Sequence, residues 1–129
     1  RVKIMVSVAN FKYMVQSGRV SPLKGYLAKI MNLKPIISLD ENGKGIAFAQ
    51  AFSQRANFKK IIDIIQKSHQ KNPVTRYCIV HSRVPELAEQ YRQSLVQILQ
   101  REPQYIEEVS SVVAMASGKG AVAVCMMSE

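Results

Sequence analysis

The pattern of apolar and polar positions predicts strands that alternate with helices along the chain. Alternating or continuous apolar runs rich in β-branched residues are typical of strands. Asn42-Gly43, between two such runs, is a strong hairpin signal. The predicted strands are Val2–Ala9, Pro35–Leu39, Gly45–Ala51, Thr75–His81, Gln104–Ser110, Ser111–Ala116 and Ala121–Met127.

Two longer stretches carry the apolar repeat of an amphipathic helix. The first is Asn57–Gln70, and the second begins at Ser82 with Pro85 in its first turn. The apolar stripes are Phe58, Ile61, Ile62 and Ile65 in the first helix, and Leu87, Tyr91, Leu95 and Ile98 in the second.

Two further helices are predicted near the start of the chain. Asn10 can cap a short helix over Phe11–Gln16, which Gly18 ends, and Ser21-Pro22 starts the next one. Arg19 therefore lies at the joint between two apolar helices.

These elements predict the fold class. The helices supply too few crossovers for a fully parallel sheet covered on both faces. We therefore expect an α/β domain of the α+β type, with two layers: a mixed sheet of about six strands and helices on one face. A length of 129 residues suits a single domain over residues 1–129.

Composition excludes several classes of protein. Apolar residues make up 47% of the chain, but no apolar run approaches the roughly 18 residues of a membrane span. The chain also has no secretory segment, and it starts at Arg1 rather than at Met. We expect a piece of a longer polypeptide with no membrane span, or else a homo-oligomer that buries the same face.

The net charge of +9 comes from 18 basic and 9 acidic residues spread over the whole chain. Because the basic residues form no long run and are not interleaved with aromatic residues, we expect no nucleic-acid partner. An acidic protein partner is compatible with this charge.

The cysteine and histidine positions do not predict an enzyme. Cys78 and Cys125 lie in strand-like segments, as expected of buried, reduced thiols in the cytoplasm. His81 is three positions from Cys78, so the two side chains should point to opposite faces of the strand. His69 is expected to be solvated. No carboxylate pair, metal cluster or phosphate-binding glycine loop is found, so we expect neither catalysis nor a cofactor.

The order of motifs resembles the C-terminal domain of the DegV family of bacterial fatty-acid-binding proteins. The resemblance rests on "SGRV" followed by "NLKPI", on "SQRANFKKIIDII" and "YCIVHSRVPELAEQY", and on a closing "GKGAVAV". It runs the whole length of the chain, whereas the N-terminal half of a family member, with its carboxylate-binding segment, has no counterpart here.

The resemblance implies a function. This domain would pack against a doubly wound N-terminal domain, the EDD fold, and the two would enclose a fatty acid. The protein would be cytoplasmic and would do no chemistry alone. It would present its fatty acid to a kinase subunit, which forms the acyl phosphate used in phospholipid metabolism.

The resemblance also implies the binding residues. Gly18 and Arg19 match the family's Gly-Gly-Arg, with Arg19 near the pocket mouth, and Arg55 matches an arginine just before the next helix. Arg19 could instead only cap the first helix. The closing turn adds Ser117, Gly118, Lys119 and Gly120, although it could also be an ordinary tight turn.

One departure from the family's sequence pattern supports a second function. Ala116 occupies the position of a family histidine that hydrogen-bonds the ligand carboxylate. The chain could therefore bind a variant ligand, or could be a DegV-like domain that has lost lipid binding and acts as an interaction module. The six methionines could line a lipid pocket or simply fill the core.

Overall fold

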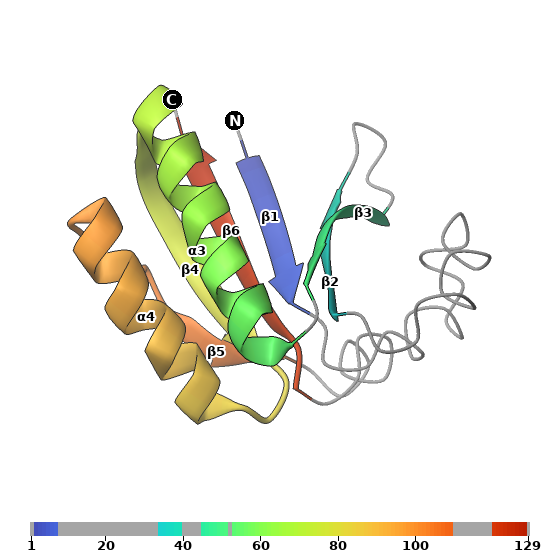
Figure 1. The fold of residues 1–129 in the computed structure, drawn as a ribbon. Coiled ribbons are helices and arrows are strands. Elements are labelled where there is room, and N and C mark those ends of the chain that lie inside the picture. Colours follow the sequence, from blue (N-terminus) through green and yellow to red (C-terminus); the bar gives the residue numbers. More distant parts are fainter. Residues whose placement is uncertain (1, 8–33, 40–44, 52, 110–119, 129) are drawn as a thin grey trace.

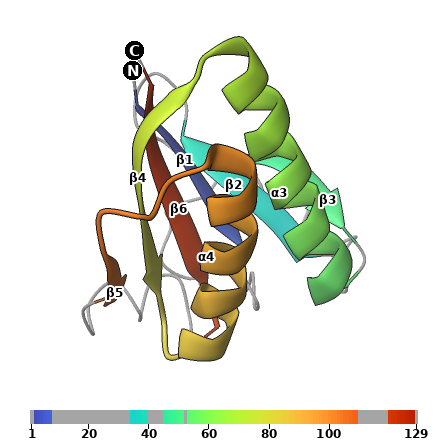
Figure 2. The ribbon, with the colours of Figure 1, turned by 90° about the vertical axis from the view of Figure 1, so that its left-hand side faces the viewer.

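The computed structural model describes residues 2–7, 34–39, 45–51, 53–109 and 120–128. These residues form one mixed sheet with two helices on one of its faces (Figures 1 and 2). The elements, in chain order, are β1 Val2–Ser7, β2 Lys34–Leu39, β3 Gly45–Ala51, α3 Gln54–Lys71, β4 Val74–His81, α4 Pro85–Leu99, β5 Ile106–Glu108 and β6 Val122–Ser128. The predicted fold class is confirmed.

The sheet has six strands in the order β3-β2-β1-β6-β4-β5. All neighbouring strands are antiparallel except β4 and β5, which are parallel. β1 and β6 lie at the centre, where Val2 pairs with Met127 and Ser7 with Val122. This pairing brings the N and C ends of the chain side by side (Figure 2).

Side-chain alternation gives the sheet two different faces. In β6, Val122, Val124 and Met126 are buried in the core, whereas Ala123 and Cys125 between them are only half-buried. Successive residues of a strand point to opposite faces, so the first set lies under α3 and α4. The second set lies on the opposite face, which no helix among the described residues covers and which is called here the helix-free face (Figure 1).

α3 begins earlier than the apolar pattern predicts, because Ser53 caps it. The Ser53 Oγ accepts a hydrogen bond from the backbone N–H of Ala56 at 3.1 Å. α4 begins at Pro85, whose missing N–H costs nothing in the first turn, and it ends at Gln100 with a left-handed φ of 57°.

The core lies between the helices and the sheet. The buried Tyr91 ring packs against the partly buried Phe58 ring, and the ring centroids are 4.6 Å apart in an edge-to-face arrangement. The buried apolar residues around it include Met5, Ile36, Ile61, Ile65, Ile79, Leu95, Val122 and Val124.

Some local expectations were wrong. The strand predicted over Gln104–Ser110 is only three residues long, because β5 pairs with β4 only from Ile106 to Glu108. His69 is not simply solvated, since its Nδ1 accepts a hydrogen bond from the Val74 N–H at 2.9 Å. The predicted helices at Phe11–Gln16 and after Pro22, and the strand Ser111–Ala116, lie outside the described residues.

Candidate functional site

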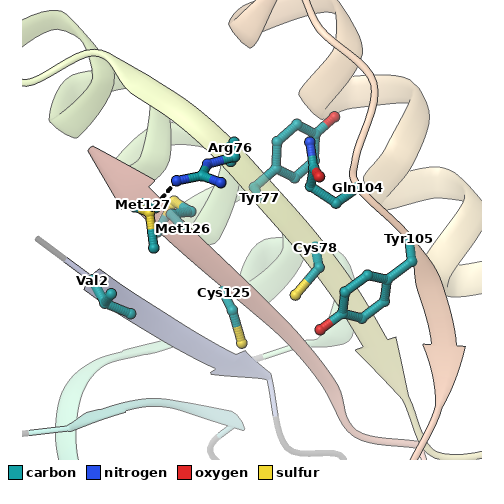
Figure 3. A pocket seen from close by; sticks show the side chains of 9 residues that line it. All are labelled: Val2, Arg76, Tyr77, Cys78, Gln104, Tyr105, Cys125, Met126 and Met127. Atoms are coloured by element: carbon teal, nitrogen blue, oxygen red, sulfur yellow. Dashed lines mark hydrogen bonds between the residues drawn. The ribbon is translucent and has the colours of Figure 1, made fainter. Parts of the chain in front are cut away.

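The helix-free face of the sheet carries an apolar cavity of about 330 Å³. It is formed where the start of β1, the start of β4 and the end of β6 meet the segment that leads into β5 (Figure 3). Its lining residues are Val2, Arg76, Tyr77, Cys78, Gln104, Tyr105, Cys125, Met126 and Met127. This volume is at the lower end of the range of small-ligand sites.

Large apolar side chains are exposed around this cavity. Val2 is 67% exposed, Tyr105 51% and Met127 38%, and all three line the cavity. A clustered apolar surface of this kind on a soluble domain marks a ligand or partner site more often than scattered single residues do.

Two sulfur atoms and a phenol form the middle of the cavity. Cys78 and Cys125 are direct partners across β4 and β6, and both are free thiols. Burial raises the pKa of Cys125 to about 11. The hydroxyl of Tyr105 interacts with the Cys78 thiol, which raises the pKa of that tyrosine. At neutral pH, the Cys125 and Tyr105 side chains are therefore uncharged.

Arg76 is the one cation among the described residues that line the cavity. Its guanidinium donates to the Met127 Sδ at 3.2 Å, an interaction drawn as the dashed line in Figure 3. The Arg76 side chain is exposed. The cavity therefore combines an apolar floor with a single positive group at its edge, a combination that suits an amphiphile with an anionic end.

A second, polar region lies at the other end of the sheet, where β1 and β4 end and both helices begin (Figure 1). Ser7 Oγ donates to Asn57 Oδ1 at 2.6 Å, and both residues are buried. The Nδ1 of His81 accepts a hydrogen bond from the Val84 N–H at 3.2 Å and so holds the turn that precedes α4. These bonds pair Ser7, Asn57 and His81 with other protein groups, whereas the buried hydroxyl of Ser82 has no hydrogen-bond partner among the described residues.

Two of the predicted binding residues are described, and both lie at this polar end. Arg55 is exposed in the first turn of α3, and Gly120 immediately precedes β6. The φ of Gly120 is 97°, a conformation that glycine adopts without strain. Its N–H donates to the Ser82 carbonyl at 2.8 Å, so this amide is not available to an anion.

The remaining predicted site residues, Gly18, Arg19, Ser117, Gly118 and Lys119, lie outside the described residues. Their roles stay predictions. The expected separation of Cys78 from His81 is confirmed: Cys78 lines the cavity on the helix-free face, whereas His81 is buried and accepts a hydrogen bond from the Val84 N–H.

Sequence reasoning missed Tyr105, Arg76 and the cross-strand pairing of the two cysteines. The sequence signal that could have pointed to this site was the alternation of inward and outward residues in β6, which places Cys125 and Met127 on the same face of the sheet. The register that brings Cys78 opposite Cys125 is a long-range property and leaves no local pattern in the sequence.

Among the described residues, no helix is long and apolar enough to cross a membrane. Nor do these residues gather three histidine, cysteine or acidic side chains in a way that could hold a metal ion.

Comparison with known proteins identifies the family. Residues 1–129 match the family described as "Uncharacterised protein, DegV family", and this chain belongs to that family. A DegV domain-containing protein from Clostridium acetobutylicum is 22% identical over 130 residues, which is 100% of this chain and 46% of that protein. The chain thus spans about half the length of the curated relatives that it matches.

The fold is shared with solved DegV structures. A fatty-acid-binding DegV family protein from Streptococcus agalactiae superposes with a TM-score of 0.87 and 23% identity, over 97% of this chain and 44% of the other. A stearic-acid-binding protein from Eubacterium ventriosum gives a TM-score of 0.83 and 12% identity, over 97% and 44%. At these identities the likeness establishes the fold.

Proposed function

We propose that this chain is the part of a DegV protein that holds the acyl chain of a fatty acid. The observation that carries the proposal is the apolar cavity on the helix-free face, with exposed Val2, Tyr105 and Met127 around it. Family membership and the lipid-binding solved members support it.

The apolar surface would supply the affinity. Removing a chain of about sixteen carbons from water is worth on the order of 10 kcal/mol, at roughly 0.8 kcal/mol for each CH₂. The cavity described here would hold only part of such a chain. We propose that the rest lies along the same face, between this domain and the second domain of a full-length member.

The finer role we propose is presentation of the bound lipid rather than catalysis. A kinase subunit would phosphorylate the carboxylate, with Arg19 holding that group near the pocket mouth. The outer side of α3 supports an acidic partner, because Arg55, Lys59 and Lys71 are exposed along it. A cytoplasmic location fits the two free thiols.

Native mass spectrometry of protein purified without added lipid tests the binding proposal. We expect a bound mass that organic extraction identifies as a long-chain fatty acid. Cys125→Phe projects a ring from the cavity floor and should lower this occupancy while the circular dichroism spectrum stays unchanged. Lys67→Ala is the matched control, because Lys67 is an exposed residue of α3, with a side chain 73% exposed.

The second candidate function is an interaction module that binds no lipid. Ala116 favours it, because a methyl group cannot make the hydrogen bond of the family histidine. Wild-type protein with no bound lipid, and no uptake of added oleic acid, would refute the lipid proposal and leave the exposed apolar face as a protein-binding surface.

A further inference from the structure

The two cysteines of the cavity lie opposite each other on neighbouring strands, and fatty-acid binding does not depend on this arrangement. Cys78 in β4 and Cys125 in β6 are register partners in an antiparallel pair, so their side chains leave the sheet on the same face. Both sulfurs lie in the cavity, with the Tyr105 ring beside them and its hydroxyl turned toward the sulfurs (Figure 3).

The backbone already meets the requirement for a disulfide. Directly opposed residues of antiparallel strands have Cα atoms about 4.5 to 5.5 Å apart. Disulfides span Cα separations of about 4.4 to 6.8 Å. The two sulfurs can therefore be joined without any change in strand register, with the two Cβ atoms moving slightly closer than in an ordinary antiparallel pair.

The two thiols are also accessible and chemically distinct. Each is half-buried in a cavity that opens to the surface at the exposed side chains of Val2 and Tyr105. The Tyr105 hydroxyl is turned toward the two sulfurs and can donate a hydrogen bond to the sulfur of Cys78 (Figure 3). Burial raises the pKa of the Cys125 thiol to about 11.

We propose that Cys78 and Cys125 are a reversible redox site, which a hydroperoxide converts into a disulfide between β4 and β6. The Cys78 thiolate attacks a peroxide oxygen, which breaks the O–O bond and leaves a sulfenic acid on Cys78. The Cys125 sulfur then displaces the hydroxyl group, and its proton leaves with that group as water. With hydrogen peroxide, two thiols lose two electrons and two protons, and two waters form.

The bridge would change the cavity itself. It would join the two strands across the cavity floor and replace two separate thiols by one fixed S–S unit. The redox state would thereby alter the surface offered to any apolar ligand. The chemistry of the bridge does not depend on whether that ligand is a fatty acid.

Intact-mass spectrometry after treatment of the reduced, folded protein with hydrogen peroxide tests this proposal. We expect the loss of two hydrogens from the monomer, one peptide that links Cys78 to Cys125 in a non-reducing digest, and full reversal by dithiothreitol. Circular dichroism before and after oxidation confirms that the fold persists.

Single substitutions test the separate roles of Cys78, Cys125 and Tyr105 in bridge formation. Cys125→Ser should stop at a Cys78 sulfenic acid that dimedone traps, whereas Cys78→Ser should react far more slowly. Tyr105→Phe should slow bridge formation while leaving the linked product the same. Oxidation of folded wild type to a mixture of sulfinic acids or intermolecular dimers, with no internal link, would overturn the proposal. So would a link that forms only in urea.

Discussion

Replacing Tyr91 by phenylalanine tests how the core beneath the helices is stabilised. The Tyr91 ring packs edge-to-face against Phe58, and the residue is 1% exposed. Its hydroxyl makes no hydrogen bond of normal geometry within the described residues, although Ser7 lies close enough to favour the phenolate slightly. Burial raises the pKa of Tyr91 to about 12, from 10.

Tyr77 provides the matched comparison. It is equally buried, at 2%, and burial raises its pKa to about 12 as well, but its hydroxyl donates to the Arg101 carbonyl at 2.8 Å. Tyr77→Phe should therefore cost about 1 kcal/mol of unfolding free energy at pH 8. Tyr91→Phe keeps the ring and removes only a poorly paired polar group, so it should be neutral or stabilising by up to about 1 kcal/mol.

At alkaline pH, wild type and Tyr91→Phe should also differ in how much folding stability they lose. Above pH 10 the unfolded chain releases the Tyr91 proton, while the folded chain keeps it until about pH 12. The unfolded state then binds fewer protons, so stability falls as pH rises. The loss reaches about 1.4 kcal/mol at pH 11, one unit above the unfolded pKa.

Urea unfolding followed by far-ultraviolet circular dichroism at pH 8 and at pH 11 measures both effects. Wild type should lose about 1.4 kcal/mol more than Tyr91→Phe between these pH values, in excess of the losses from other groups that the two proteins share. An equal loss in both proteins would show that folding does not raise the pKa of Tyr91, and a cost at pH 8 as large as that of Tyr77→Phe would show that the Tyr91 hydroxyl is well bonded.

The remaining predictions concern a helix cap, a turn and the proposed presentation site. Ser53→Ala should lower the unfolding free energy by about 1 kcal/mol, because the Ala56 N–H loses its acceptor, and thermal unfolding would report this. Gly120→Ala should cost roughly 1–2 kcal/mol, since a Cβ is disfavoured at a φ of 97°; an unchanged melting temperature would mean that the turn relaxes. Arg19→Ala in the full-length protein should leave lipid binding nearly intact but reduce acyl-phosphate formation by roughly tenfold or more, as expected for one lost charge-assisted contact. Arg19→Lys should rescue it only partly, whereas a large loss of stability with normal turnover would identify Arg19 as a helix cap.

The two described helices and the longer described strands could be predicted from the sequence because each depends on local chemistry. The alternation in β1 and β6 and the apolar stripe of α3 each bury one set of residues whatever lies opposite. The buried stripe of α4 differs slightly from the predicted one. Its buried residues are Ala88, Tyr91, Leu95 and Leu99, whereas Leu87 and Ile98 are only partly buried.

The sheet order could not be predicted in the same way. β6 lies between β1 and β4, and its register pairs Val2 with Met127 across almost the whole chain. No local pattern encodes which strands become neighbours, since any strand with one apolar face can pair with any other. β5 is shorter than its sequence suggests because only three of its residues reach the ladder with β4.

The candidate site depends on this non-local order. Cys125 and Cys78 look like ordinary buried residues in their own strands, and Tyr105 looks like an ordinary residue of the predicted strand Gln104–Ser110. Only the β4–β6 register and the return of the chain toward β5 bring the three side chains into one cavity. The helices cover the other face, so the apolar residues of this face have no partner among α3 and α4. Within the part of the chain that the structure describes, no helix covers this apolar surface, and a flexible acyl chain can follow such a surface along several strands without a matching set of hydrogen bonds.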